Sequence, residues 1–455
     1  MPNKKRYLVT HADTNLSVSP VAEILGLSAE NIRHGVSFLA TDAQPGEKDV
    51  LEFSNLGITS VSLDAKEVTR LKEHSNIMAV EEDVEMRILE APAISVEDER
   101  RIETNGDYQN DAYQRGYQEG VQQIMESMNQ FRGQPDGFGP LHSMFSNPQL
   151  LPFLSRQMPP IPLATQPIPW NISQVKAPGA WARGINGAGI RVAVIDTGIS
   201  NHPDLLPIAG GVSLVPGVVS HNDDNSHGSH CAGIIGARNN GIGVVGVAHS
   251  CKLYAVKVLN AAGSGMSSWI IAGMDWAASQ GIHVASMSLG GLSGPIVAYA
   301  QAIKRLQDRG TVVVIAAGNS FQQPAFPWVN APGNSIIPGV PNASPIAVGA
   351  IDSHAIIAPF SSRGGQTPVW NQVEVVAPGV NINSTVLGGA YALKSGTSMA
   401  TPHVAGAAAL LKQRFPGISP ASVKMKLMST ATDLGAGGYD KTYGAGLINC
   451  NSATL

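Results

Sequence analysis

The chain is poor in cysteine, in aromatic residues and in charge, and each shortage narrows the kinds of protein it can be. Three cysteines in 455 residues exclude a small scaffold held together by disulfides, although they leave secretion open. Aromatic residues make up 5% and charged residues 14%, whereas 49 glycines are typical of tight turns and closely packed helices. No apolar run reaches the roughly 18 residues of a membrane-spanning helix. The hydrophobic fraction of 43% is enough for a sizeable core, and the length suggests two or three domains.

Lys and Arg residues are not clustered in any segment of the sequence. No run of Lys and Arg, and no basic patch with interleaved aromatics, indicates nucleic-acid binding. The net charge of −4 is nevertheless unevenly divided. Residues 1–165 hold 14 Lys and Arg against 24 Asp and Glu, a net of −10, and residues 166–455 hold 16 against 10, a net of +6. We expect the acidic part to attract the basic part; alternatively, both are simply solvated surfaces.

Three short segments carry reactive side chains. Ser398 lies in the segment 394–406 (KSGTSMATPHVAG), at the start of a predicted helix, where free N–H groups stabilise negative charge. Taken alone, such a residue also fits a simple helix cap. Asp196 ends the apolar run 192–196 (VAVID), as a buried parallel strand would end at the carboxyl edge of its sheet. Taken alone, it also fits a turn cap.

The third segment is 227–233 (HGSHCAG), which begins with His227. A zinc site on His227 and His230 competes here, but no further Cys or His cluster lies nearby at ligand spacing. Serine is a weak nucleophile that needs an adjacent base, a neutral histidine is such a base, and a carboxylate orients the histidine. The three segments together therefore supply the parts of an acyl-transfer site, in the order acid, base, nucleophile.

That order is the one known for subtilisin, and residues 165 to 450 resemble a subtilisin-type serine protease, a subtilase. A fourth segment, 312–320 (VVVIAAGNS), agrees with the resemblance. The resemblance implies that Asp196, His227 and Ser398 form the triad of an endopeptidase acting on proteins or peptides. It implies that Asn319 binds the oxyanion together with the Ser398 N–H.

The implied fold is α/β, a parallel sheet with helices on both faces. We expect strands over 191–196, 252–258, 282–288, 311–316 and 346–350, and helices over 227–237, 264–280, 295–309, 398–415 and 419–430.

The resemblance also places the substrate as an added strand between two chain segments. The implied substrate-binding residues are Gly263, Ser264 and Gly265 on one edge, Ser288, Leu289 and Gly290 on the other, and Ala316 and Gly318 in the P1 pocket. The segment 336–339 (IIPG) departs from the family at the far wall of that pocket, and Ser267 replaces a bulky P4 lid, so we expect an apolar P1 residue of limited size.

A structural calcium ion is the one cofactor that the resemblance implies. Its implied ligands are the side chains of Gln166, Asp204 and Asn240 and the carbonyls of Arg238, Ile242 and Val244. Such an all-oxygen shell suits Ca²⁺. Without the resemblance the same residues read as surface turns. No organic cofactor is expected.

The first 90 residues read as a separate α+β unit, with strands over 5–10, 57–63 and 76–84 and a helix over 65–73. They resemble the subtilase propeptide, a small ferredoxin-like domain that templates folding and inhibits the enzyme through its C-terminal tail. An unrelated α+β domain is the alternative. We divide the chain into a propeptide domain, 1–90, an insertion, 91–164, and a catalytic domain, 165–455.

The insertion is unusual for the family. Apolar residues over 107–131 recur at helical spacing, which predicts an amphipathic helix that docks on either domain or pairs with another chain, and a Pro-rich linker follows. Alignment on the propeptide tail puts Leu89 at P1, whereas alignment on the mature start puts the new N-terminus near Thr165. We expect two cuts, one near Leu89 and one near Ala164; a single cut in the linker is the competing hypothesis.

Some questions stay open at this stage. Cys231 follows the histidine by four residues and resembles the free, buried thiol that some subtilases carry, whereas Cys251 and Cys450 cannot be assigned.

The first six residues (MPNKKR) hold no apolar signal region. The compartment is therefore extracellular if a leader was removed and intracellular otherwise, and the propeptide favours export. The competing functions are a transpeptidase or cyclase of the same fold and a catalytically silent binding protein.

Overall fold

The computed structural model describes residues 4–12, 20–41, 43–89, 91, 166–337, 344–365 and 372–455. Residues Met1–Ala91 and Gln166–Leu455 belong to one compact unit. The predicted amphipathic helix, the Pro-rich linker and the cut near Ala164 lie outside the described residues, and the division of the chain into three parts stays a prediction. Within the described part, no helix is both long enough and apolar enough to cross a membrane.

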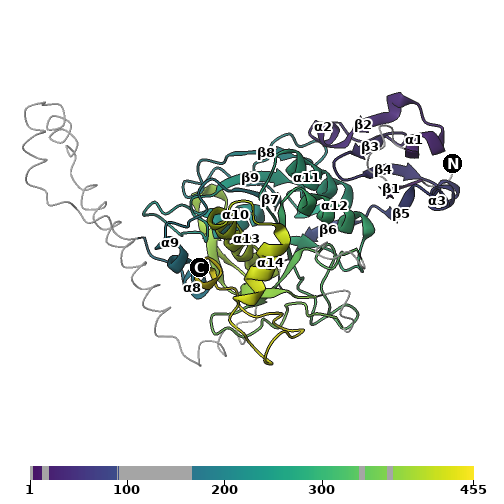
Figure 1. Cartoon of the computed structure of the whole chain (residues 1–455). Coiled ribbons are helices and arrows are strands. Elements are labelled where there is room, and N and C mark those ends of the chain that lie inside the picture. The colour runs from purple at the N-terminus through teal and green to yellow at the C-terminus, as the bar shows by residue number, and fades with distance from the viewer. Residues whose placement is uncertain are drawn as a thin grey trace, which may run out of the picture. The chain divides into compact units, whose positions relative to one another are not determined.

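A seven-stranded sheet in the order β15-β14-β13-β11-β7-β9-β8 forms the centre of residues 166–455 (Figure 1). Every pairing in it is parallel. The inner strands are almost continuous runs of Val, Ile and Ala because helices cover both of their faces. The strands are β7 (Arg191–Asp196), β8 (Gly210–Ser213), β9 (Lys252–Lys257), β11 (Val284–Met287), β13 (Val312–Ala316), β14 (Ile346–Ile351) and β15 (Val375–Pro378).

Helices pack on both faces of this sheet, as expected. α13 (Thr397–Arg414) contacts β11, β13, β14 and β15 and lies beside α10 (His227–Gly236). Its residues are buried nearly all round, which explains why small apolar residues fill it. α11 (Ser267–Ser279) and α12 (Val297–Asp308) pack against each other and against β7 and β13, respectively. The remaining elements are α8 (Trp170–Gln174), α9 (Ala177–Trp181), α14 (Pro420–Ser429), α15 (Cys450–Ala453) and the hairpin of β16 (Ile382–Thr385) and β17 (Tyr391–Lys394).

Most predicted boundaries differ from the structure by one or two residues, but one helix begins later for a physical reason. The predicted helix over 264–280 starts at Ser267, because Ser264–Met266 forms a separate strand, β10. This strand pairs with the N-terminal segment, a partner that helical periodicity does not reveal. The strands β8, β15, β16 and β17 were not predicted.

The N-terminal residues form a five-stranded sheet in the order β2-β3-β4-β1-β5. Its elements are β1 (Lys5–His11), α1 (Pro20–Leu25), β2 (Ile32–His34), α2 (Gly35–Leu39), β3 (Val50–Phe53), β4 (Ile58–Leu63), α3 (Ala65–Lys72) and β5 (Ile77–Glu82). Without the short β2 and α2, the chain order is β-α-β-β-α-β, that of a ferredoxin-like motif. The predicted closing strand ends early, at Glu82, after which β6 (Glu85–Ile88) pairs elsewhere.

The two faces of this N-terminal sheet have different partners. One face packs on the segment's own helices, around Val9, Val61 and Leu71. Residues of the N-terminal segment such as Leu8 and Phe53 belong instead to a core that also contains Ile270 and Met274 of α11. The N-terminal segment therefore shares a hydrophobic core with the rest of the chain, which makes the contact between them a packed interface.

Candidate active site

The last strand of the N-terminal segment lies in a cleft of the C-terminal part. β6 pairs antiparallel with β10 on one side and with β12 (Leu289–Gly290) on the other. The N–H of Ile88 donates to the carbonyl of Gly263 at 2.9 Å. The structure thus brings the residues predicted for both cleft edges around one extended peptide, in the geometry of strand addition.

Leu89 follows β6, and its carbonyl oxygen is the meeting point of two donors. The Ser398 hydroxyl donates to this oxygen at 3.1 Å, and the side-chain amide of Asn319 donates to it as well. The amide of Asn319 is oriented by Thr397, whose N–H and hydroxyl both donate to its oxygen at 2.9 Å. The NH₂ group therefore faces Leu89, as an oxyanion donor would face a reacting carbonyl.

The chain contacts the C-terminal part again two residues beyond this carbonyl. Ala91, two residues after Leu89, donates its N–H to the carbonyl of Ser395 at 3.3 Å. Contacts with the C-terminal part therefore lie on both sides of the peptide bond that follows Leu89.

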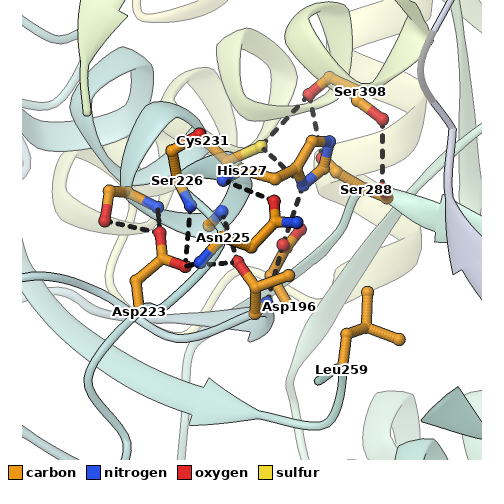
Figure 2. Close-up of polar contacts among 12 residues, drawn as sticks. Asp196, Asp223, Asn225, Ser226, His227, Cys231, Leu259, Ser288 and Ser398 are labelled. Carbon is orange, nitrogen blue, oxygen red and sulfur yellow. Dashed lines mark hydrogen bonds and ion pairs between the residues drawn. The ribbon is translucent and has the colours of Figure 1, made fainter. Parts of the chain in front are cut away.

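Asp196 and His227 come from the end of β7 and the first residue of α10. The Nδ1 of His227 lies 2.8 Å from Oδ1 of Asp196, and both side chains are fully buried. In Figure 2 the imidazole lies between Asp196 and Ser398. Among the described residues, Nε2 of His227 has no hydrogen-bond partner, so this atom is open to accept a proton.

The charge around His227 favours the imidazolium. Burial of the ring lowers its pKa, but the negative charge of Asp196 and then the neighbouring Cys231 act in the opposite direction. Together with the hydrogen bond to Asp196, they raise the pKa of His227 well above 6.5. A base whose protonated form is stabilised in this way can take a proton from a neighbouring hydroxyl.

Ser398 is held in place by contacts of its backbone carbonyl and of its hydroxyl. Pro402 lies in α13 four residues later and has no N–H to donate to this carbonyl. Ser288 Oγ and Cys231 Sγ take its place, at 2.9 and 3.5 Å. The Ser398 hydroxyl lies 3.0 Å from the Ser288 carbonyl. The proline four residues after Ser398 indicates that this carbonyl needs a partner from outside the helix, but the sequence does not show that Ser288 is that partner.

The thiol of Cys231 is free and buried, as expected, and Cys251 and Cys450 are also free and buried.

The contacts of the His230 ring do not support the alternative of a zinc site on His227 and His230. Nε2 of His230 lies 3.0 Å from the Ile382 carbonyl and 2.9 Å from the Ala392 carbonyl. His230 thus ties α10 to the β16–β17 hairpin.

Glycine is needed where the cleft closes around the peptide. A Cβ on Gly290 would lie 2.8 Å from the Ala331 carbonyl oxygen and 3.1 Å from Cδ1 of Leu89, and one on Gly318 would lie 1.8 Å from Oδ1 of Asn330. Ala316, predicted beside Gly318 in the P1 pocket, is buried at the end of β13. The far wall at 338–339 lies outside the described residues. Ser267, predicted at the P4 lid, donates through N–H and hydroxyl to the Val84 carbonyl, both at 2.9 Å.

Two carboxylates of the N-terminal segment cap helices of the C-terminal part, which the sequence analysis did not foresee. Glu81 accepts from the N–H groups of Val297 and Ala298 at the start of α12, at 2.8 and 2.9 Å. Asp83 accepts from the N–H of Ser268 at the start of α11, at 2.9 Å. No ion pair joins the two parts among the residues described. Both carboxylates thus lie at helix N-termini, where negative charge is favoured.

The predicted calcium ligands lie together. Gln166 donates from Nε2 to the carbonyls of Ile242 and Val244, both at 2.7 Å, and accepts from the N–H of Asn240 at 2.8 Å. Asp204 accepts from the N–H of Val244 at 3.0 Å through one carboxylate oxygen.

The other carboxylate oxygen of Asp204 is buried and has no hydrogen-bond partner in the described chain. Arg238 donates its N–H to the Asp204 carbonyl at 2.9 Å. Its guanidinium bonds the carbonyls of His249 and Cys251 instead, which leaves the Arg238 carbonyl as its only group suited to a cation. A carboxylate oxygen without a partner and backbone carbonyl oxygens are the kinds of ligand that Ca²⁺ prefers.

Comparison with known proteins agrees with this geometry. The model of the subtilase family matches residues 187–446. The chain is 49% identical over 289 residues to Subtilisin Savinase of Lederbergia lenta, a match that covers 64% of this chain and 99% of that protein. It is 49% identical over 289 residues to an alkaline protease of Shouchella clausii, covering 64% of this chain and 70% of that protein. It is 47% identical over 292 residues to Subtilisin amylosacchariticus of Bacillus subtilis subsp. amylosacchariticus, covering 63% and 71%.

Proposed function

The chain belongs to the subtilase family and is a serine endopeptidase, and we propose that it is made as a zymogen that cuts its own chain after Leu89. One observation carries the proposal: the Leu89 carbonyl oxygen is hydrogen-bonded by both Ser398 and Asn319. The chain contacts the C-terminal part again at Ala91. A peptide bond held between the nucleophile and an oxyanion donor is placed as a substrate.

The proposed reaction assigns these residues the roles of a serine-protease triad and oxyanion donor. Ser398 Oγ attacks the carbonyl carbon of Leu89 while Nε2 of His227 takes the hydroxyl proton, and Asp196 stabilises the imidazolium. The negative charge that develops on the carbonyl oxygen is stabilised by Asn319. The bond from Leu89 to Glu90 then breaks as the imidazolium gives its proton to the leaving amine. Water hydrolyses the acyl-enzyme, with His227 again as the base, which releases Leu89 as a free carboxylate and restores Ser398.

After the cut, the N-terminal segment would remain as an inhibitor. Its tail pairs with both cleft edges through β6, and its sheet shares a hydrophobic core with α11. Glu81 and Asp83 add helix caps that do not depend on the broken bond. A second cut near Ala164 remains part of the proposal, and it falls outside the described residues.

We also propose that Gln166, Asp204, Asn240 and the carbonyls of Arg238, Ile242 and Val244 hold a structural calcium ion. The unpaired oxygen of Asp204 supports this. The ion would neutralise that buried charge and tie the residues after the insertion to the loop around Asn240. Gln166 would have to present its amide oxygen in place of the nitrogen that now bonds two carbonyls.

A fluorophosphonate probe tests the catalytic proposal against its rivals. We expect the wild type, matured with calcium, to be labelled at Ser398 and to hydrolyse a peptide that has Leu at P1. The Ser398→Ala variant should be neither labelled nor active. A catalytically silent binding protein would leave the wild type unlabelled. A transpeptidase or cyclase would be labelled but, offered a competing amine, would give mostly the aminolysis product instead of the free acid.

A further inference from the structure

Asp223 lies in the loop before α10, and its carboxylate is buried among neutral donors. Oδ1 accepts from the Thr197 hydroxyl at 2.8 Å and from the N–H groups of Asn225 and Ser226 at 2.9 and 3.0 Å. Oδ2 accepts from the N–H and the hydroxyl of Ser229 at 2.9 and 2.7 Å. Such a carboxylate is satisfied by hydrogen bonds alone, and these bonds reach two different elements (Figure 2).

The first of these elements is the end of β7. Thr197 follows Asp196 and donates its N–H to Asp196 Oδ1 at 2.7 Å. The Thr197 hydroxyl donates to Asp223 and accepts from the N–H of Gly228 at 2.9 Å. Gly228 follows His227, and a Cβ on Gly228 would lie 2.1 Å from the Gly198 carbonyl, so the two backbones are in close contact. The hydrogen bonds of Asp223 thus connect the residues next to Asp196 with those next to His227.

The second element is α10 itself. Its N-cap residue, Ser226, has a left-handed backbone with φ of 94°, and its side chain makes no capping hydrogen bond. Asp223 supplies the cap instead, because it takes the N–H groups of Ser226 and Ser229. Burial raises the pKa of Asp223, but the hydrogen bonds from Ser229, Asn225 and Thr197 outweigh it, and the net pKa is lowered. The cap is therefore a carboxylate at neutral pH, the charge that a helix N-terminus favours.

We propose that Asp223 is a positioning residue for this enzyme, which holds the end of β7 and the start of α10 in the arrangement that keeps the His227 ring on Asp196. Asp223 contacts no reacting atom, and it acts through Thr197 and through the first turn of α10. The inference rests on the triad roles proposed above. A misplacement of about 1 Å in such a pair lowers the rate on the order of 100-fold, so the loss of this arrangement should be measurable as a loss of rate.

The groups that shift the pKa of His227 are Asp196 at the end of β7 and Cys231 on α10, and His230 of the same helix is in turn affected by His227. Removing the charge of Asp223 leaves all of these in place. We therefore expect the pKa of His227 to stay as it is, so that a loss of rate in an Asp223 variant reports the position of the ring and not its charge.

The substitution Asp223→Asn keeps the shape and removes the charge and one acceptor. We expect kcat of the matured enzyme to fall about 10- to 100-fold with KM changed less than about threefold, and the acid limb of the pH profile of kcat/KM to stay where it is in the wild type. The matched control is Glu374→Gln. Glu374 is also a buried carboxylate, bound to the N–H of Ala347 at 2.7 Å and to Lys424 at 2.9 Å, and it directly precedes β15, an edge strand of the sheet. Its loss should lower the melting temperature and leave kcat and the acid limb unchanged.

A second pair of variants covers the case in which Asp223→Asn does not mature. Thr197→Val removes the hydroxyl that bridges Asp223 and Gly228, and Thr197→Ser retains it. We expect the Val variant to lose kcat without a matching rise in KM and the Ser variant to recover it. The inference is overturned if Asp223→Asn keeps the kcat of the wild type, or changes only the melting temperature as Glu374→Gln does. If Asp223→Asn does not mature, the same outcomes for Thr197→Val overturn it. An inactive, unlabelled wild type would instead overturn the proposed function.

Discussion

The hydroxyl of Ser398 donates to the carbonyl oxygen of Leu89 across 3.1 Å, joining two residues that lie 309 positions apart in the chain. The contact places the tail of the N-terminal segment at the nucleophile of the same molecule. It unites the two roles proposed for that segment in one geometry, since the peptide proposed to be cut first would also be the one that stays bound between β10 and β12. The predictions below test the parts of that geometry separately.

Asn319 is the donor whose removal should affect the rate and not the binding. We expect Asn319→Ala to lower kcat about 100- to 1,000-fold, a magnitude known from subtilisin itself, with little change in KM, because the amide bonds charge that develops only in the transition state. Steady-state kinetics on a soluble peptide measure both constants. The control is Asn451→Ala, which removes an amide that bonds Arg183 away from the cleft. A KM effect as large as the kcat effect would contradict the oxyanion role.

Activity should be lost on acidification, because a protonated His227 cannot accept the proton of Ser398. Burial lowers the pKa of His227, but Asp196 and then Cys231 raise it by more, so the net shift is upward from 6.5. We therefore expect kcat/KM of the mature enzyme to fall with a one-proton slope whose midpoint lies above pH 6.5. Initial rates between pH 5 and 9 locate this midpoint. A midpoint near pH 4, typical of a carboxylate, would assign the limb to another group.

The two helix caps should determine how tightly the N-terminal segment inhibits. Glu81→Gln and Asp83→Asn each weaken a charge-assisted hydrogen bond to a helix N-terminus. At about 1.5–3 kcal/mol for such bonds, we expect each to raise the inhibition constant of the added N-terminal segment about 10- to 100-fold. Glu82→Gln is the neighbouring control, since Glu82 pairs with Lys5 within the segment. Equal inhibition by all three variants would show that the shared apolar core alone determines binding.

Calcium should stabilise the fold through Asp204. We expect added calcium to raise the melting temperature of the Ser398→Ala zymogen, and a chelator to lower it, because a ligand at 100 times its dissociation constant adds about 2.7 kcal/mol. Asp204→Asn should abolish this calcium dependence. Asp308→Asn, on the exposed face of α12, should retain it, since Asp308 pairs with Lys304 there. A calcium response unchanged in Asp204→Asn would place the ion elsewhere.

The sequence was most informative where a reactive residue stands at the end of a regular element. Asp196 ends an apolar strand and His227 and Ser398 begin helices, so local pattern located all three. The central strands followed from their runs of Val and Ile, because burial on both faces leaves little choice of residue.

Features that depend on distant partners could not be read in this way. β10 is short and polar, and it is a strand only because β6 pairs with it. The caps by Glu81 and Asp83 join residues about 200 positions apart, and nothing in the local sequence distinguishes them from the exposed Glu82. The role of Asp223 was missed for the opposite reason: it is local, but the neighbouring Asp224 and Asn225 are equally good capping residues by sequence.

The most direct measurement is to express the wild type and Ser398→Ala side by side with calcium and to determine the intact masses and terminal sequences of all fragments. We predict that the wild type alone releases an N-terminal fragment whose last residue is Leu89, whatever trimming follows near Ala164. An N-terminal fragment that ends at another residue, or identical cleavage of both proteins, would contradict self-cleavage at the peptide bond that Ser398 and Asn319 hold.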